Sequence, residues 1–260
     1  MDKRKIIYYK SETDDEFSVA KIEPKTIDGS YDYMRDKPHQ KFLKRFILRP
    51  VAFTLAKIYL CTVFGHKTVN AEALKPYLRK AYFIYGNHTQ DIADALIPSL
   101  LSPRKNAYVL VHPNNVSMPF LGKITPYLGA IPLPDDKAAR QNYTEAIDRR
   151  IAEGGAITVY PEAHIWPYYT GIRPFSDNSF YYPVKYGVPV FCFTNTYHKG
   201  RFGREPKIVT YIDGPFFADE TLPYRQRRTE LRNRVYDCMR ERARLSDEVK
   251  IKYVREGEND

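Results

Sequence analysis

The chain has 260 residues, of which 43% are hydrophobic and 28% charged, a balance typical of an ordered globular protein and not of a disordered one. An excess of 41 Lys and Arg over 31 Asp and Glu gives a net charge of +10, which favours polyanionic partners such as nucleic acid, anionic lipid or phosphorylated small molecules. Three widely spaced cysteines argue against a disulfide framework or a cysteine zinc site, and indicate a reducing, cytosolic setting.

The N-terminal quarter of the chain divides into a polar arm, residues 1–38, and an apolar but basic segment, residues 39–66. The arm has no apolar core of the kind found in secretory signal peptides. In the second segment, Pro50 and Lys57 interrupt the apolar runs, which are shorter than the roughly 20 residues that a membrane-spanning helix needs. The segment is expected to form a helix that either lies in the headgroup plane of a membrane or packs inside the protein.

Short apolar runs alternate with helical patterns through the middle of the chain. Several runs are continuously apolar, as in strands that are covered on both faces. The expected strands are Ala81–Tyr85, Ala107–Val111, Ala130–Leu133, Ala156–Tyr160, Val188–Phe193 and Lys207–Ile212. Before the fourth strand, apolar positions three or four residues apart predict a helix capped by Asp135 or Asp136 and ended by Gly154-Gly155. The pattern predicts an α/β fold, with a mixed, largely parallel sheet flanked by helices.

The C-terminal part is highly charged. From Arg225 onward, a narrow apolar stripe formed by Leu231, Val235, Cys238 and Met239 predicts a surface helix that packs on one side. We therefore expect one domain over residues 67–245, followed by a charged tail, residues 246–260, whose final stretch VREGEND is frayed.

The strongest local signal for chemistry is the segment Tyr82–Leu101, YFIYGNHTQDIADALIPSLL. A buried strand is followed by a Gly-Asn turn and by His88, which we expect at the start of a helix carrying Asp91 and Asp94. Catalytic residues of α/β domains gather at this end of strands, and a carboxylate beside a histidine fixes the ring tautomer of a general base. A helix-capping or core histidine is the alternative interpretation of His88.

A second segment, Ala156–Phe175, repeats this arrangement. After the expected strand come Pro161, Glu162, His164 and Arg173 together with several aromatic residues. Polar and aromatic side chains that follow a buried strand are typical of a binding loop, although a rigid structural loop has the same composition.

Together the two segments resemble a known family. Glycerophospholipid acyltransferases, which include the lysophosphatidic acid (1-acylglycerol-3-phosphate) acyltransferases, share a block N-H-x-x-x-x-D after one strand and a block (F/Y)-P-E-G-x-R after a later one. The corresponding residues here are Asn87-His88…Asp94 and Tyr160-Pro161-Glu162-Ala163-His164. The stretches MPFLGKITPYLGAIPL, residues 118–133, and YGVPVFCFTN, residues 186–195, follow in the family's order. The resemblance covers residues 82–195 and identifies the chain as a divergent member.

The resemblance implies transfer of an acyl group from acyl-CoA or acyl-carrier protein to a lysophospholipid hydroxyl, without a further cofactor or a metal. It also implies a peripheral location on the cytoplasmic face of the cell membrane. His88 would be the catalytic base and Asp94 its partner, with Asp91 in reserve, and backbone N–H groups at the start of the helix would stabilise the oxyanion. The expected substrate-binding residues are Asn87, Pro161, Glu162, His164 and Arg173.

Three positions depart from the family pattern. The spacing from His88 to Asp94 is six positions instead of five, Ala163 replaces the glycine of the later block, and Ile165 replaces its arginine. A further family arginine is missing after GAIPL. In the family these arginines are associated with binding of the acceptor phosphate. We therefore expect Arg173 or Lys185 to supply the positive charge here.

Other functions have weaker support in the sequence. Cys192 lies in an apolar run, where a cysteine usually behaves as a small hydrophobic residue. The histidines at 88, 112, 164 and 198 match no metal-ligand spacing. Nucleic-acid binding would use the basic charge and the aromatic residues but needs no His–Asp pair. An acyltransferase acting on another lipid or alcohol, and a catalytically silent membrane-surface protein, remain as alternatives.

Overall fold

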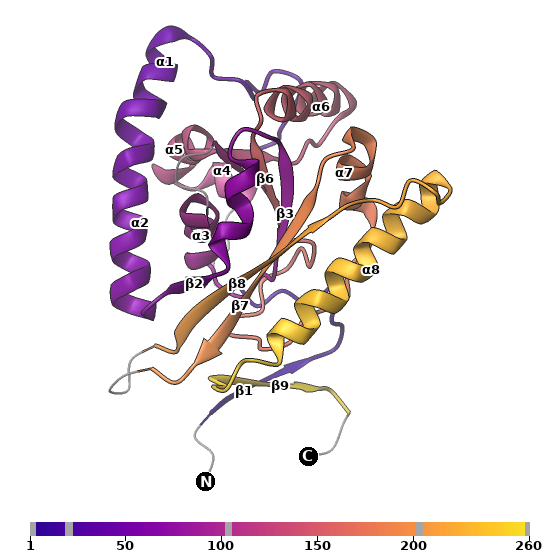
Figure 1. The fold of residues 1–260 in the computed structure, drawn as a ribbon. Helices are drawn as coiled ribbons and strands as arrows, with labels where there is room; N and C mark the ends of the chain where they lie inside the picture. Colours follow the sequence, from indigo (N-terminus) through magenta and orange to yellow (C-terminus); the bar gives the residue numbers. More distant parts are fainter. Residues whose placement is uncertain (1–3, 19–22, 102–105, 201–204, 258–260) are drawn as a thin grey trace.

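The computed structural model describes residues 4–18, 23–101, 106–200 and 205–257. Its centre is a seven-stranded sheet with the strand order β2-β8-β7-β3-β6-β4-β5 (Figure 1). All neighbouring strands are parallel except β7 and β8, so the expected mixed, largely parallel sheet is confirmed. The strands are β2 (Lys67–Val69), β3 (Tyr82–Gly86), β4 (Ala107–Val111), β5 (Ala130–Pro132), β6 (Ala156–Val159), β7 (Val190–His198) and β8 (Lys207–Phe216).

Helices cover both faces of this sheet (Figure 1). On one face lie α6 (Lys137–Ala152), α7 (Tyr181–Tyr186) and α8 (Tyr224–Ala243), and on the other lie α2 (Arg49–Phe64) and α3 (Ala93–Leu101). The shorter helical elements are α1 (Pro38–Phe42), the π-helix Leu43–Leu48, the 3₁₀ helix Ala71–Tyr77, α4 (Asn114–Ser117), α5 (Leu121–Leu128) and the 3₁₀ helix Asn178–Phe180.

Strand β3 shows why the central strands are continuously apolar. Its side chains alternate between the two faces, so Phe83 and Tyr85 join the core under α8 while Tyr82 and Ile84 join the core under α2 and α3. Because both faces are covered, every residue of β3 is buried. A strand of this kind holds the loop that follows it in a fixed position.

The predicted strands are present, with ends that shift by a few residues, and β7 and β8 run further than expected. Helix α6 begins where predicted, because Asp136 accepts a hydrogen bond from the Ala139 N–H at 2.6 Å. Helix α8 buries Leu231, Val235 and Met239 as the stripe predicts.

Two short strands and the edge strand β2 are not expected from the sequence. In the N-terminal arm, β1 (Lys5–Tyr9) pairs in parallel with β9 (Ile251–Arg255) in the tail, so Val254 and Arg255 are ordered in a strand and are not frayed. Residues 258–260 of the predicted frayed stretch lie outside the described residues. The arm also packs on the domain, since Ile27 is 1% exposed.

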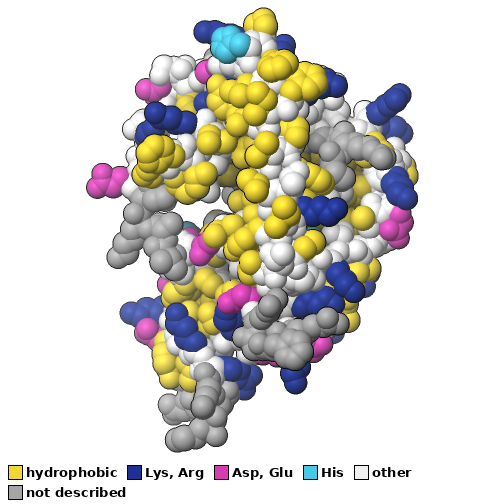
Figure 2. Space-filling view, turned by 90° about the vertical axis from the view of Figure 1, so that its left-hand side faces the viewer, with side chains coloured by type: hydrophobic (Ala, Val, Ile, Leu, Met, Phe, Trp, Pro, Cys, Tyr) yellow, Lys and Arg dark blue, Asp and Glu magenta, His cyan; other side chains and the backbone are white. Residues whose placement is uncertain are grey.

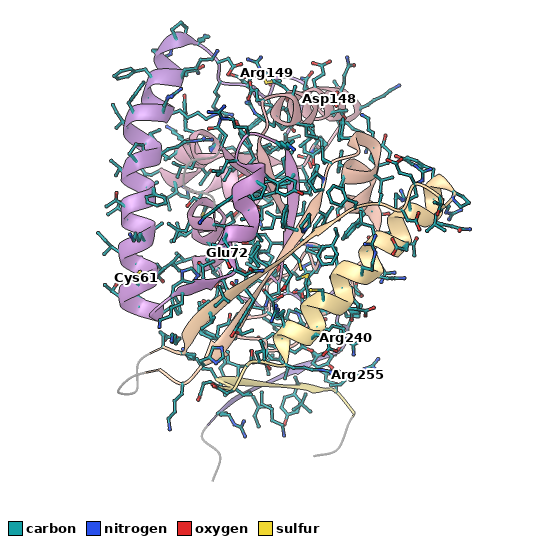
Figure 3. The ribbon with its side chains drawn as sticks, in the orientation of Figure 1. Cys61, Glu72, Asp148, Arg149, Arg240 and Arg255 are labelled. Atoms are coloured by element: carbon teal, nitrogen blue, oxygen red, sulfur yellow. The ribbon has the colours of Figure 1, made fainter. Side chains whose placement is uncertain are left out.

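The apolar basic segment forms one continuous helix of 27 residues, Pro38–Phe64, which passes through α1, the π-helix and α2. By length and composition alone it is long enough to cross a membrane, which the interrupted apolar runs did not predict. Only 11% of its most apolar window is buried, so it is not the buried packing helix of the alternative interpretation. Figure 2 shows hydrophobic side chains in a band along this face with Lys and Arg beside them, and Cys61 projects outward from α2 (Figure 3).

Candidate active site

The two sequence blocks meet at the carboxyl ends of the adjacent parallel strands β3 and β6. The loop after β6 donates backbone hydrogen bonds to the loop after β3, from Trp166 N to the His88 carbonyl at 3.1 Å and from Tyr168 N to the Thr89 carbonyl at 3.0 Å. The blocks therefore form one structural unit, although they are about 70 positions apart. Helix α3 begins at Ala93, so His88 and Asp91 precede the helix and do not lie in it as expected.

His88 pairs with Asp94. The ring Nδ1 lies 2.9 Å from Asp94 Oδ2, and the two side chains are 19% and 1% exposed. A carboxylate accepts, so Nδ1 carries the hydrogen, and Nε2 is left as the basic ring nitrogen. The one extra residue in the spacing is absorbed by the loop before α3. Asp91 makes no such bond, and much of its side chain is exposed. The part of it that is buried, followed by the negative charge of Glu16, raises the pKa of this carboxyl group.

The His88 ring also stacks on Tyr160, with the ring centroids 4.5 Å apart and the planes 20° from parallel. The Tyr160 hydroxyl donates to the backbone carbonyl of Asp94. Burial, followed by the nearby Asp94, raises the pKa of Tyr160 well above its usual value, so this hydroxyl stays protonated. Tyr160 therefore fixes both members of the His–Asp pair.

The backbone N–H groups beside His88 are already used. Thr89 N and Gln90 N donate to Asp94 Oδ2 at 2.8 and 2.9 Å, and His88 N donates to Glu162 Oε2 at 3.2 Å. These three groups hold carboxylates and are not free to bind a developing oxyanion. The expected donors would therefore have to come from the first turn of α3 itself or from other groups that line the cavity.

Glu162 and Arg173 form a buried ion pair behind His88. Glu162 Oε2 lies 3.1 Å from an Arg173 guanidinium nitrogen, and both side chains are 0% exposed. The guanidinium also donates to the carbonyls of His164 and Glu12 and lies over the Trp166 ring. Because Glu162 also accepts from His88 N, the pair fixes the backbone of the histidine, and neither residue is in the lining of the cavity beside it.

Asn87 has a similar place in the structure. Its side chain accepts from Asn195 N at 2.8 Å and donates to the Asn195 carbonyl at 3.0 Å, and the residue is 1% exposed. The amide thus ties the end of β3 to β7. His164 pairs with Glu16 of the N-terminal arm at 3.2 Å. Among the five expected substrate-binding residues, Pro161 is the one that lines the cavity described next.

A cavity of about 610 Å³ opens beside His88, a size that suits a small-molecule or lipid substrate. Its walls are largely apolar, with Val109, Leu110, Val111, Leu133, Val159 and Ile165 among them. Polar groups also line it, including His112, Asn115, Arg140, Asn178, Ser179 and Tyr182. The arrangement places the His88–Asp94 pair at the wall of a mainly apolar chamber.

The cationic group of this cavity is not one that the sequence indicated. Arg173 is buried in its ion pair, and Lys185 on α7 lies near Asp148 and Tyr186, so neither lines the cavity. Arg140, in the first turns of α6, does line it, and within the described part of the chain no carboxylate pairs with its guanidinium. The sequence around Arg140, in a charged helix, does not distinguish it from its neighbours. Only the packing of α6 beside the cavity identifies Arg140 as a lining residue.

Cys192 is fully buried under α8, away from the cavity lining. A hydrogen bond with Cys238, together with burial, raises the pKa of the Cys192 thiol, which makes it unreactive. With Asp213, whose carboxylate is held by Arg242 at 2.7 and 2.8 Å, these cysteines form the cluster of potential metal ligands found among the described residues.

Comparison with known proteins assigns this chain to a family. Residues 65–194, half of the chain, match the model of the family described as Acyltransferase. The chain belongs to the acyltransferase family. The match spans both sequence blocks and the strands that carry them, and it confirms the resemblance drawn from the motifs.

The fold of this acyltransferase is similar to the crystal structure of the 1-acyl-sn-glycerophosphate (LPA) acyltransferase PlsC from Thermotoga maritima. The TM-score is 0.53 and the identity 22%, over 83% of this chain and 86% of that one. At this identity the likeness concerns the fold. No curated protein matches the sequence.

Proposed function

We propose that this acyltransferase moves a fatty acyl group from a thioester, acyl-CoA or acyl-carrier protein, to the hydroxyl group of a lysophospholipid such as 1-acylglycerol-3-phosphate. The observation that carries the proposal is the His88–Asp94 pair, 2.9 Å apart, at the wall of a mainly apolar cavity in a member of this family. A chamber of this kind suits an acyl chain, and the histidine suits a hydroxyl group that must lose a proton.

In this mechanism the acceptor hydroxyl donates its proton to His88 Nε2 while its oxygen attacks the thioester carbonyl carbon. The tetrahedral intermediate then expels the thiolate, which takes the proton from His88. Asp94 holds Nδ1–H and stabilises the transiently charged ring. No acyl-enzyme forms, which agrees with the burial of Cys192.

Arg140 would hold the acceptor phosphate. It is the Lys or Arg side chain among the described residues that line the cavity, whereas the family's arginine position after Glu162 is the apolar Ile165. A guanidinium matches a phosphate well because it offers several donors in one plane. An acceptor without a phosphate is the second candidate, and Ile165 favours it.

The helix Pro38–Phe64 would hold the protein on an anionic membrane, with the active site at the cytoplasmic face. Its exposed apolar side chains include Phe42, Phe46, Ile47, Val51, Leu55 and Ile58, and the exposed Lys41 and Arg45 stand beside them. Apolar side chains can enter the acyl boundary while the basic ones contact anionic headgroups. Nucleic acid is not a proposed partner.

The test is thiol release from palmitoyl-CoA by the purified protein on anionic liposomes, with lysophosphatidic acid, monoacylglycerol or no acceptor. His88→Ala should lower acceptor-dependent release by about 10²–10⁴-fold, the usual contribution of a general base. His198→Ala is the matched control, because this histidine contacts Asp247 and Thr196 and does not line the cavity.

Each outcome decides a part of the proposal. Full turnover by folded His88→Ala would remove His88 from the mechanism. Turnover of monoacylglycerol but not of lysophosphatidic acid would replace the phosphorylated acceptor by an uncharged one. Liposome binding without thiol release from any donor would leave a catalytically silent membrane-surface protein.

A further inference from the structure

A chain of four hydrogen bonds extends from His88 through the sheet to the foot of α2. His88 Nδ1 bonds Asp94 Oδ2 at 2.9 Å, and Asn195 Nδ2 donates to Asp94 Oδ1 at 3.3 Å. Thr210 Oγ1 then donates to Asn195 Oδ1 at 2.6 Å, and His66 Nε2 lies 2.9 Å from Thr210 Oγ1. We propose that Thr210 is a positioning residue, which holds the Asn195 amide with its N–H group toward Asp94 and so sets the pH at which His88 becomes a free base. The proposal rests on the proposed function of His88.

The direction of each bond follows from the donors that are present. The Asp94 carboxylate only accepts, so Asn195 has to turn its NH₂ group toward it and its oxygen toward Thr210. The Thr210 hydroxyl donates its single hydrogen to that oxygen and can only accept from His66. His66 therefore carries its hydrogen on Nε2, and all the donors point toward Asp94.

The fold places these residues opposite one another. Asn195 on β7 and Thr210 on β8 are direct partners in the antiparallel pair, and Thr210 also faces Thr68 of β2, one strand further out. Asn195 and Thr210 are 1% and 0% exposed, so water does not compete for their hydrogen bonds. Burial lowers the pKa of His66 to about 4, so this ring is neutral, with the same donor, at neutral pH and above.

Asp94 does not need Asn195 to stay in place. Its Oδ2 accepts from His88, Thr89 N and Gln90 N, and these three bonds are independent of β7 and β8. Loss of the Thr210 hydroxyl would therefore leave the His–Asp pair assembled. It would release the oxygen end of the Asn195 amide, so that the amide can withdraw from Asp94.

This withdrawal removes partial positive charge from beside Asp94. The carboxylate then stabilises the protonated His88 ring more strongly, so the ring keeps its proton to a higher pH. The other charged and titratable groups described near His88 or in its cavity are Asp91, Tyr143, Tyr160, Glu162 with Arg173, Tyr182, Glu16, His112 and Arg140. None of them contacts Thr210, so they stay constant in the comparison.

The experiment compares Thr210→Val, which keeps the shape and loses the hydroxyl, with Thr210→Ser, which keeps the hydroxyl. The His88 ring signals are titrated by NMR, with His88→Gln used for their assignment. In Thr210→Val the midpoint should move up by about 0.5 to 1 pH unit, since a neighbouring dipole acts more weakly than a full charge. Thr210→Ser should titrate like the wild type. The acid limb of kcat/KM should move by the same amount, with kcat nearly unchanged well above the midpoint.

The proposal is overturned if Thr210→Val and Thr210→Ser titrate alike, or if Thr210→Val loses activity equally at every pH, as a merely structural defect would. If Thr210→Val does not fold, His66→Phe replaces it, and the midpoint should move in the same direction by a smaller amount. Failure of the proposed function is separate: His88→Ala would then keep its turnover, while the NMR midpoints would still measure the effect of Thr210.

Discussion

The substitution Arg140→Gln tests which acceptor this acyltransferase prefers. Arg140 lines the cavity from α6, and no carboxylate in the described part of the chain competes for its guanidinium. A hydrogen bond to a charged group contributes about 1.5–3 kcal/mol, and the exposed position of Arg140 favours the lower end of that range. A loss of about 1.5 kcal/mol corresponds to roughly tenfold in an equilibrium constant. We therefore expect the KM for lysophosphatidic acid to rise about tenfold and kcat to change little.

The assay is thiol release at saturating palmitoyl-CoA with either lysophosphatidic acid or monoacylglycerol varied. Only the phosphorylated acceptor should respond to Arg140→Gln. Lys137→Gln removes one positive charge from the same end of α6, and Lys185→Gln removes one from α7, both outside the cavity lining. If Lys137→Gln raises the KM as much as Arg140→Gln, the effect is one of net charge. If Arg140→Gln raises the KM for both acceptors equally, Arg140 does not bind the acceptor phosphate.

Three further predictions concern the site and its supports. Asp94→Asn should lower kcat by about 10²–10⁴-fold with little change in KM, because the amide does not stabilise the protonated His88 ring; an unchanged rate contradicts the role of the pair. Ala163→Gly should raise the melting temperature by about 2–4 °C, since Ala163 has a φ of 64° and relief of that backbone contributes roughly 1 kcal/mol; calorimetry that shows a lower melting temperature opposes this. The double variant Phe46→Glu with Leu55→Glu should weaken sedimentation with anionic liposomes by about 100-fold or more, because each apolar side chain contributes about 1.5–3 kcal/mol when buried, whereas Ile6→Glu on β1 should not.

The sequence predicted much of the fold because its central strands are buried on both faces. A largely apolar run such as Ala156–Tyr160 needs no partner to be recognised, and the strand found there, Ala156–Val159, is buried throughout. Strands β1 and β9 were missed for the opposite reason. Each is short and only partly buried, and each is defined by its pairing with the other end of the chain, which no local pattern contains.

The His–Asp pair was predicted because the first of the two family blocks contains both of its members, and the structure adds the geometry that chooses between the two carboxylates. Asp91 and Asp94 are both near His88 in the sequence. Only the turn of the loop before α3 brings Asp94 Oδ2 to Nδ1 and leaves Asp91 exposed. The choice depends on a backbone path and therefore could not be read from spacing.

What the sequence determined by itself was the class of sheet, the two family blocks and the apolar basic helix, since each is a local pattern of residue types. The tertiary structure decided which side chains face the cavity. It buried Arg173 against Glu162, used Asn87 to join β3 to β7, and brought Arg140 from α6 to the cavity wall. It also joined Thr210 and His66 to Asp94 through Asn195. These contacts depend on strand order and helix packing between distant parts of the chain. The sequence around a charged or polar residue does not indicate which distant residue it will contact.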